Sequence, residues 1–222
     1  MSYLMTHSLL SSWQYCLKEN PFEDATSERD SFAEFLQVLR REPTPTNEAM
    51  QNGIDFEDLV TKILLCVDTV PCEIIDAELK GSVITEESIR SHPWFLAASK
   101  VAGIIRHGQL QVVAKKQIIV DNTPLLLYGR LDALKAGGVY DIKFSKSYDR
   151  GKYFDSTQHP MYMELVPAAK DFSYLVSNGE HVWTEKYRRD ECKNIRHTIS
   201  DFLGWLEVMG LMDLYRQHWS TT

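Results

Sequence analysis

The sequence predicts a mixed α/β fold in which a β-sheet is flanked by helices, with an added helical segment at the N-terminus. Three observations favour this fold. Apolar residues recur at helical spacing in the first 42 residues and again from about 47 to 67. Strand-like stretches bounded by turn residues follow between 111 and 187. A long amphipathic stretch, expected to be one closing helix, runs from Cys192 to Tyr215.

Length and composition fit one sizeable domain. The chain has 222 residues, of which 44% are hydrophobic and 11% aromatic, enough to fill a buried core. We expect a single domain over 1–222, with a helical N-terminal decoration at 1–46, a core at 47–190 and the closing helix at 191–222. No run of about 18 apolar residues occurs, and no basic start precedes an apolar segment. Neither a membrane span nor a signal peptide is predicted, and a cytoplasmic location is expected.

Two helical regions are expected before the strands. Pro43 and Pro45 end the first. The second runs from about Asn47, a plausible N-cap, through Val67. Its apolar stripe consists of Phe56, Val60, Ile63, Leu64 and Val67. Glu57 lies at the edge of this stripe, whereas Asp55 and Asp58 point elsewhere. By itself the pattern favours an exposed carboxylate at a helix margin.

The middle of the chain contains strands and turns. Short β-like pieces are expected around 73–79, with a turn at Gly81. A helix is expected from about 92 to 107, followed by strands at 111–120 and 125–132 with residues 122–124 as their turn. Ser156 or Thr157 can cap a helix that tolerates Pro160 in its first turn. A second hairpin is expected from 171 to 187 around Asn178-Gly179.

The stretch 125–143 reads as a β-hairpin that gathers charged side chains. If Gly137 and Gly138 form the turn, Leu134 opposes Asp141 and Asp132 opposes Lys143. Because side chains alternate along a strand, Asp132, Asp141 and Lys143 then project to one side. Such a trio is costly to desolvate unless it is paired or bound to a cation. If one strand were shifted by one residue against the other, the three side chains would no longer lie on the same side.

Asp132, followed nine residues later by Asp141-Ile142-Lys143, resembles the signature of the PD-(D/E)XK nuclease superfamily. The stretch 53–57, Gly-Ile-Asp-Phe-Glu, resembles the first motif of the RecB-like, phage-type exonuclease branch, and Gln158 to Tyr162 resembles its QxxxY motif. The pieces occur in the expected order over roughly residues 50–190. The resemblance implies a restriction-endonuclease-like mixed sheet in the core.

The resemblance also implies a metal site and roles for named residues. Glu57, Asp132, Asp141 and the carbonyl of Ile142 would bind Mg²⁺, for which Mn²⁺ could substitute, because hard cations prefer oxygen ligands. Lys143 would orient the nucleophile or stabilise charge on the phosphate, completing a catalytic set of Glu57, Asp132, Asp141 and Lys143. Gln158 and Tyr162 would support the site and contact substrate.

Two basic residues and four cysteines complete the set of candidates. Arg150 and Lys152 lie in the polar loop after Lys143 and are expected to bind substrate phosphates. Some RecB-like relatives hold an iron–sulfur cluster through a downstream cysteine cluster, which is missing here, so no such cluster is expected. The four cysteines, Cys16, Cys66, Cys72 and Cys192, lie far apart.

The sequence departs from the family pattern in two places. Glu57 stands where many RecB-like members have histidine. Because glutamate is an adequate metal ligand, this difference bears on the branch to which the sequence belongs and not on metal binding. Phe144-Ser145 follows Lys143 where DxKT is common, and this bears only on fine geometry.

The leading interpretation is a magnesium-dependent exodeoxyribonuclease acting in recombination, repair or phage DNA processing. DNA would be its partner, with a second copy or a single-strand annealing protein as further partners and no membrane. A net charge of −7 weighs against DNA binding, although residues 112–196 contain 14 basic and 11 acidic side chains. One alternative is a non-catalytic nucleic-acid-binding module that retains the fold, which the intact acids and lysine disfavour. Another is a sequence-specific endonuclease, which QxxxY disfavours.

Overall fold

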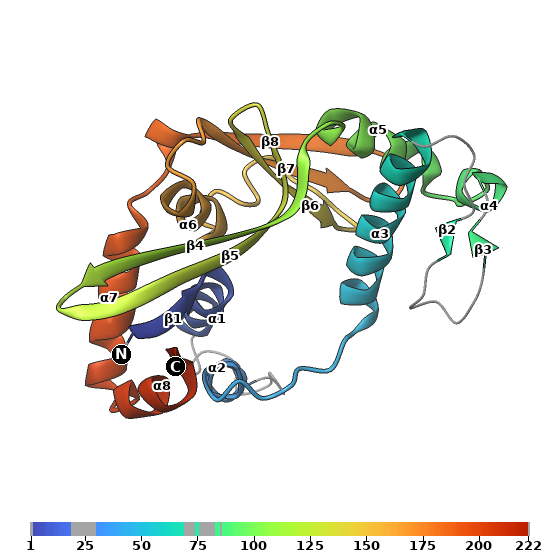
Figure 1. Cartoon of the computed structure of the whole chain (residues 1–222). Coiled ribbons are helices and arrows are strands. Elements are labelled where there is room, and N and C mark those ends of the chain that lie inside the picture. The colour runs from blue at the N-terminus through green and yellow to red at the C-terminus, as the bar shows by residue number, and fades with distance from the viewer. Residues whose placement is uncertain (1, 19–29, 69–73, 76–82, 85, 222) are drawn as a thin grey trace.

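A computed structural model describes residues 2–18, 30–68, 74–75, 83–84 and 86–221. The fold is a mixed α/β fold with a seven-stranded sheet and helices packed on it, as the sequence predicts (Figure 1). The strands are β1 (Ser2–Thr6), β4 (Gln109–Val120), β5 (Thr123–Lys135), β6 (Gly138–Phe144), β7 (Asp171–Ser177), β8 (Val182–Arg188) and β9 (Ser220–Thr221). They follow the order β8-β7-β6-β5-β1-β9, and β4 also pairs with β5. The short strands β2 (Ile74–Ile75) and β3 (Val83–Ile84) pair separately.

The helices divide between two hydrophobic cores. Their bounds are α1 (His7–Lys18), α2 (Ser31–Leu39), α3 (Glu48–Asp68), α4 (Glu86–Arg90), α5 (Phe95–Ile105), α6 (Gln158–Leu165), α7 (Ile195–Val208) and α8 (Met212–Trp219), with a 3₁₀ turn at Arg189–Glu191. Helices α1, α2, α6, α7 and α8 contribute to the larger core, and α3, α4 and α5 to the smaller one. Within the described residues, every helix is too short or too polar to cross a bilayer.

Strand β5 is central in the sheet, and its pairing partner on one edge changes along its length. It pairs with β4 along its whole length. On its other edge it pairs first with β1, in parallel at residues 125–128, and then with β6, antiparallel at residues 133–135. Residues 129–132, here called the fork, therefore lie between the part of β5 that pairs with β1 and the part that pairs with β6. Asp132 is the last residue of the fork, so it lies at a gap in the sheet.

The β5–β6 turn differs from the predicted one by one residue. Lys135 pairs with Gly138, so Ala136 and Gly137 form the turn, both with positive φ (51° and 80°). This places Asp132 level with Asp141 instead of Lys143. A shift of the turn by one residue moves the opposing strand by two, which preserves the faces because side chains alternate with period two. The predicted pairs were wrong, but the predicted convergence of the three side chains survives.

The fold adds to one prediction and corrects another. The N-terminal segment contains the helices α1 and α2, but residues 2–6 before them form a strand that lies between β5 and β9 in the sheet. The expected closing helix is two helices, α7 and α8, because the chain turns at Gly210 with φ 68°.

Smaller predictions had mixed outcomes. The β4–β5 turn falls at Asp121-Asn122, both with positive φ, one residue before the predicted position. The hairpin around Asn178-Gly179 is confirmed. Of the predicted features at 73–81, only β2 falls on described residues, and the turn at Gly81 lies outside them.

The beginning of α3 follows the prediction closely. Asn47 Oδ1 accepts a 2.9 Å hydrogen bond from the backbone N–H of Met50, as an N-cap does. Phe56 is buried in the stripe, Asp55 and Asp58 are exposed, and Glu57 is half-buried between them. The helix period therefore correctly separated Glu57 from its neighbouring acids.

Candidate active site

The structure gathers four of the predicted charged residues from three elements. Glu57 comes from α3, Asp132 from the fork of β5, and Asp141 and Lys143 from β6. Lys143 Nζ lies 2.8 Å from Asp141 Oδ2. Asp132 is close enough to both Asp141 and Glu57 for their charges to raise its pKa. The hairpin and the helix stripe, which were separate patterns in the sequence, therefore meet in one place.

Asp141 is the most deeply buried acid of the group, with 3% of its surface exposed. The side-chain amide of Gln158, the first residue of α6, donates a hydrogen bond to its Oδ1. Lys143 neutralises the other oxygen. The carboxylate is thus fixed from both sides, which sets its direction within the site.

Asp132 is held by the backbone. The N–H of Ile142 donates a 2.7 Å hydrogen bond to Asp132 Oδ2. The β5–β6 ladder ends with the pair Ala133–Tyr140, so this amide meets a side chain where a backbone carbonyl would otherwise lie. The contact shown for Ile142 thus involves its amide, and the role of its carbonyl as a metal ligand stays a prediction.

Glu57 is held by a residue that sequence reasoning missed. The side-chain amide of Gln111 donates a hydrogen bond to Glu57 Oε1. Gln111 lies in β4 between the pairs Leu110–Ala133 and Val112–Leu131, level with Asp132, and its φ is 52°. A left-handed backbone is uncommon for glutamine and such outliers cluster at functional sites. No local sequence signal marks this residue.

Burial and mutual repulsion disfavour ionisation of all three acids. Burial, together with the charges of Asp141 and Glu57, raises the pKa of Asp132 to about 8. Burial also raises the pKa of Asp141 despite the opposing charge of Lys143, and that of Glu57 despite its bond to Gln111. Burial alone would lower the pKa of Lys143, but the two aspartates outweigh it and raise that pKa. The three acids therefore resist ionising together, and a bound cation would favour their charged forms.

Helix α6 brings Gln158 and Tyr162 to the fork. Tyr162 donates a 2.8 Å hydrogen bond from its hydroxyl to the carbonyl of Arg130, inside the fork. This close approach needs Gly129, because a Cβ there would lie 2.5 Å from Tyr162 Cε1 and 2.8 Å from Leu165 Cδ1. A real Cβ does not tolerate such distances, so the glycine is a condition for docking the helix.

His7 is a second residue that sequence reasoning missed. It is the first residue of α1, and its ring meets the ring of Tyr162 edge-on with centroids 5.5 Å apart. Burial and the nearby charge of Lys143 lower its pKa to about 4. The imidazole is therefore neutral near pH 7 and can donate or accept a hydrogen bond beside the acids. Only the tertiary fold brings it there.

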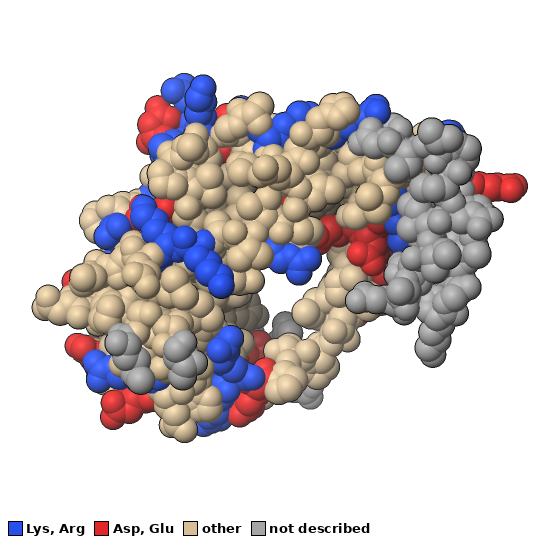
Figure 2. Space-filling model, in the orientation of Figure 1, with Lys and Arg blue, Asp and Glu red and all other residues tan. Residues whose placement is uncertain are grey.

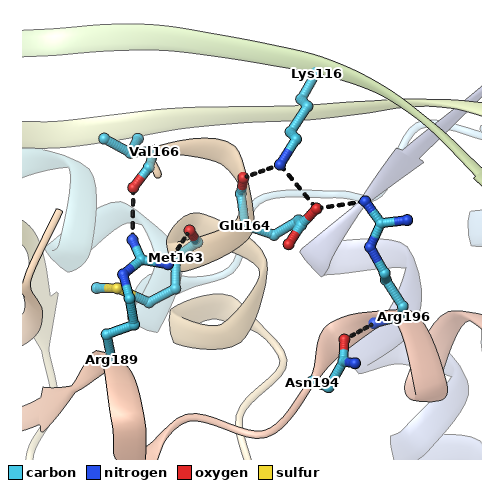
Figure 3. A network of polar contacts seen from close by, with 7 residues as sticks. All are labelled: Lys116, Met163, Glu164, Val166, Arg189, Asn194 and Arg196. Atoms are coloured by element: carbon cyan, nitrogen blue, oxygen red, sulfur yellow. Dashed lines mark hydrogen bonds and ion pairs between the residues drawn. The ribbon is translucent and has the colours of Figure 1, made fainter. Parts of the chain in front are cut away.

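A polar network fixes the far end of α6 (Figure 3). Arg189 donates to the carbonyls of Met163 and Val166 at 2.8 and 2.7 Å, satisfying groups that a helix end leaves unpaired. Glu164 Oε1 accepts from Lys116 on β4 at 2.9 Å and from Arg196 on α7 at 2.8 Å. The helix is thus tied to a strand and to a second helix, which makes it a rigid support for Gln158 and Tyr162.

Arg150 and Lys152 lie in an ordered loop outside the carboxylate group. Glu185 on β8 accepts hydrogen bonds from the amides of Gly151 and Tyr153 at 3.2 and 3.1 Å and so anchors this loop. Lys152 Nζ turns back to Ser145 Oγ at 2.7 Å. Both basic residues are exposed, and among the described residues no hydrogen bond or ion pair joins either of them to the site acids. Their contact with substrate stays a prediction.

The carboxylates of the site are the donor set available to a divalent cation. Among the described residues, no three His, Cys, Asp or Glu side chains lie close enough together to form a complete ligand cluster. Asp132 and Asp141 remain as neighbouring carboxylates of raised pKa. Magnesium keeps several waters and is usually bound through one or two carboxylates, so this pair fits its chemistry. It does not fit zinc or an iron–sulfur cluster, which prefer nitrogen or sulfur donors.

No protein-family model matches the sequence, and no curated protein matches it. A solved structure from Eubacterium rectale, named as a candidate exonuclease, matches with a TM-score of 0.53 at 12% identity. The match covers 98% of this chain and 83% of that one. The crystal structure of SSO0001 matches at 19% identity over 69% of this chain and 87% of that one, with a TM-score of 0.38. At these identities, the first match shows a common fold with the candidate exonuclease and nothing finer.

Proposed function

We propose that this protein is a metal-dependent deoxyribonuclease of the PD-(D/E)XK type, and that it cleaves DNA phosphodiester bonds from an end. The observation that carries the proposal is the pair of aspartates at the fork of the sheet. Asp132 and Asp141 have raised pKa values, and Lys143 lies 2.8 Å from Asp141. Structural ion pairs usually balance charge, whereas full ionisation of this group would leave negative charge in excess.

The chain's own residues would divide the chemistry as follows. Asp132 and Asp141 would hold Mg²⁺ or Mn²⁺, and Glu57 would add negative charge nearby without completing a three-residue ligand cluster. When bound, the cation polarises the phosphate and lowers the pKa of a bound water. Lys143 keeps its proton, because its pKa is raised, and would stabilise negative charge on the phosphate oxygens. Gln158 and Ile142 would keep the two aspartates in place.

The common fold with the candidate exonuclease supports this proposal, and the order of the sequence motifs agrees with it. The test is incubation of purified protein with end-labelled linear DNA, with and without Mg²⁺. Mg²⁺-dependent release of short products supports the proposal. Measurable DNA binding without cleavage in Mg²⁺ or Mn²⁺ would instead support a non-catalytic module.

A further inference from the structure

We infer that three aromatic rings at the edge of the sheet, those of Tyr148, Trp183 and His181, form a stacking platform for the bases of a single DNA strand. The inference rests on the proposal that DNA is the substrate, and it adds a binding surface to the carboxylate site. The centroids of the Tyr148 and Trp183 rings lie 5.4 Å apart. Those of Trp183 and His181 lie 5.8 Å apart, with an angle of 23° between the ring planes. The three rings, here called the aromatic row, therefore follow one another without a break.

The aromatic row is packed at one end and open at the other. Tyr148 and Trp183 are partly buried against the larger core, and the Tyr148 hydroxyl donates a 2.6 Å hydrogen bond to Glu185. The His181 side chain is 67% exposed. Unstacked bases of single strands bind on rings of this kind, histidine included. A base that lies on His181 would extend the row by one member.

The backbone beneath His181 is held in place. Asn178 Oδ1 accepts a 2.8 Å hydrogen bond from the His181 N–H, and the Ser177 hydroxyl donates a 2.9 Å bond to the His181 carbonyl. Trp94 packs so closely on Gly179 that a Cβ there would lie 2.5 Å from Trp94 Cδ1. A support that is already ordered loses little conformational entropy when a ligand binds, which favours a binding role. It also means that the His181 side chain can be changed without disturbing the turn.

The aromatic row lies on the same face of the sheet as the candidate site. Lys143 on β6 pairs with Val176 on β7, and Val176 pairs with Trp183 on β8. Paired residues of neighbouring strands project to one face, so the Trp183 side chain shares a face with Lys143. At about 4.8 Å per strand, the two backbones lie about 10 Å apart. This is about three nucleotides at the 3.4 Å rise of one strand, so a strand with a phosphate at Lys143 would reach the row.

Arg150 offers a phosphate contact beside the aromatic row. It is exposed, and it lies with Tyr148 in the loop between β6 and α6. Burial and the hydrogen bond to Glu185 raise the pKa of the Tyr148 hydroxyl to about 12, and the nearby positive charge of Arg150 opposes this rise. A guanidinium next to stacked rings matches the two parts of a nucleotide, its phosphate and its base.

The charge of the protein also favours stacking as a source of affinity. The net charge is −7. On the face drawn in Figure 2, Lys and Arg lie in separate groups among uncharged residues. Proteins that hold single strands without sequence preference combine positive charge with aromatic side chains, so a small basic surface leaves a larger share to the rings. A base inside a duplex is already stacked on its neighbours, and the row therefore favours a strand that is unpaired there.

The test asks whether bases contribute to binding and whether the aromatic row is the reason. Two single-stranded oligonucleotides of about 16 nucleotides are compared, one normal and one abasic throughout, so that both carry the same phosphates. Their dissociation constants are measured by fluorescence anisotropy in EDTA, which removes divalent cations and so prevents metal-dependent cleavage. The wild type should bind the normal strand about 5- to 100-fold more tightly, the effect of one stacked base.

Three variants assign this preference to the row. His181→Leu should lose most of it, whereas His181→Phe, which keeps a ring, should retain it. Tyr15→Leu removes an exposed ring on α1 and should behave like the wild type. The salt dependence of binding should not change in His181→Leu, because stacking displaces no counterions. Equal binding of the two strands by the wild type, a full preference in His181→Leu, or an equal loss in Tyr15→Leu would each overturn the inference.

Cleavage of end-labelled DNA in Mg²⁺ separates this inference from the proposed function. A preference for bases that depends on His181, in a protein that leaves DNA intact, would sustain the aromatic row and overturn the nuclease. Cleavage by a protein that binds both oligonucleotides equally would sustain the nuclease and overturn the row. Absence of binding to either oligonucleotide would also overturn the row.

Discussion

Gln111 lies level with Asp132 on the neighbouring strand, and its left-handed backbone, with φ 52°, aims its amide at Glu57. One strained position in β4 therefore connects the carboxylate on helix α3 with the fork in β5. Local strain of this kind costs of order 1–3 kcal/mol and persists only where the surroundings enforce it.

Replacing Gln111 tests whether this contact positions Glu57. Gln111→Leu should lower Mg²⁺-dependent cleavage by roughly 10- to 100-fold, the usual effect of losing a residue that orients a metal ligand. Gln111→Gly should lose as much activity while melting at the same or a higher temperature, because glycine relieves the left-handed backbone. Full activity in both variants, measured beside their melting curves, would mean that the contact is incidental.

Removing the charge of Asp132 should stabilise the protein most at high pH. Below about pH 4 the Asp132 carboxyl is protonated in both the folded and the unfolded protein, so its ionisation has no effect on stability there. Between that pH and about 8, the carboxyl is ionised in the unfolded protein but stays largely protonated in the folded protein. Wild-type stability therefore falls as the pH rises. Without divalent cations, the melting temperature of Asp132→Asn minus that of wild type should grow from pH 5 to pH 8. Each 1 kcal/mol of added stability raises the melting temperature by about 2–4 °C for a chain of this size. A constant or shrinking difference would contradict the raised pKa.

Gly129 tests the docking of α6 against the fork. Gly129→Ala places a Cβ 2.5 Å from Tyr162 Cε1, so we expect a loss of about 1–3 kcal/mol in the free energy of unfolding, together with reduced activity. Gly204→Ala is the matched control, since nothing lies within 4 Å of that position in α7 and alanine favours helix by about 0.5–1 kcal/mol. Chemical denaturation of both variants decides the point. Equal stability of the two would refute the close approach.

The two basic loop residues should differ in their effect on DNA binding. Because Lys152 is engaged with Ser145, Arg150→Ala alone should reduce the salt slope of binding by about one unit, and adding Lys152→Ala should change it by less than another unit. Titrations at several salt concentrations measure these slopes. Slopes that stay at the wild-type value would show that the loop does not touch phosphate.

Much of the site could be predicted because the helix and strand periods fix the direction in which its side chains point. The helix period separated Glu57 from Asp55 and Asp58, and strand alternation kept Asp132, Asp141 and Lys143 together despite a misplaced turn. Strand β1 was missed because it is only five residues long and pairs with residues more than a hundred positions away. Gln111 and His7 were missed because their role arises from proximity created by the whole fold.

Metal-dependent cleavage at this site is tested by the Mg²⁺ dependence of Asp141→Asn, compared with that of Asp55→Asn, which changes an exposed acid of α3 outside the site. Release of labelled nucleotides from linear DNA is measured across a Mg²⁺ titration at equal protein concentration. We predict wild-type rates in Asp55→Asn and a loss of at least about 100-fold in Asp141→Asn, with a folded protein whose melting temperature holds or rises. Wild-type cleavage by Asp141→Asn would contradict the assignment of this site.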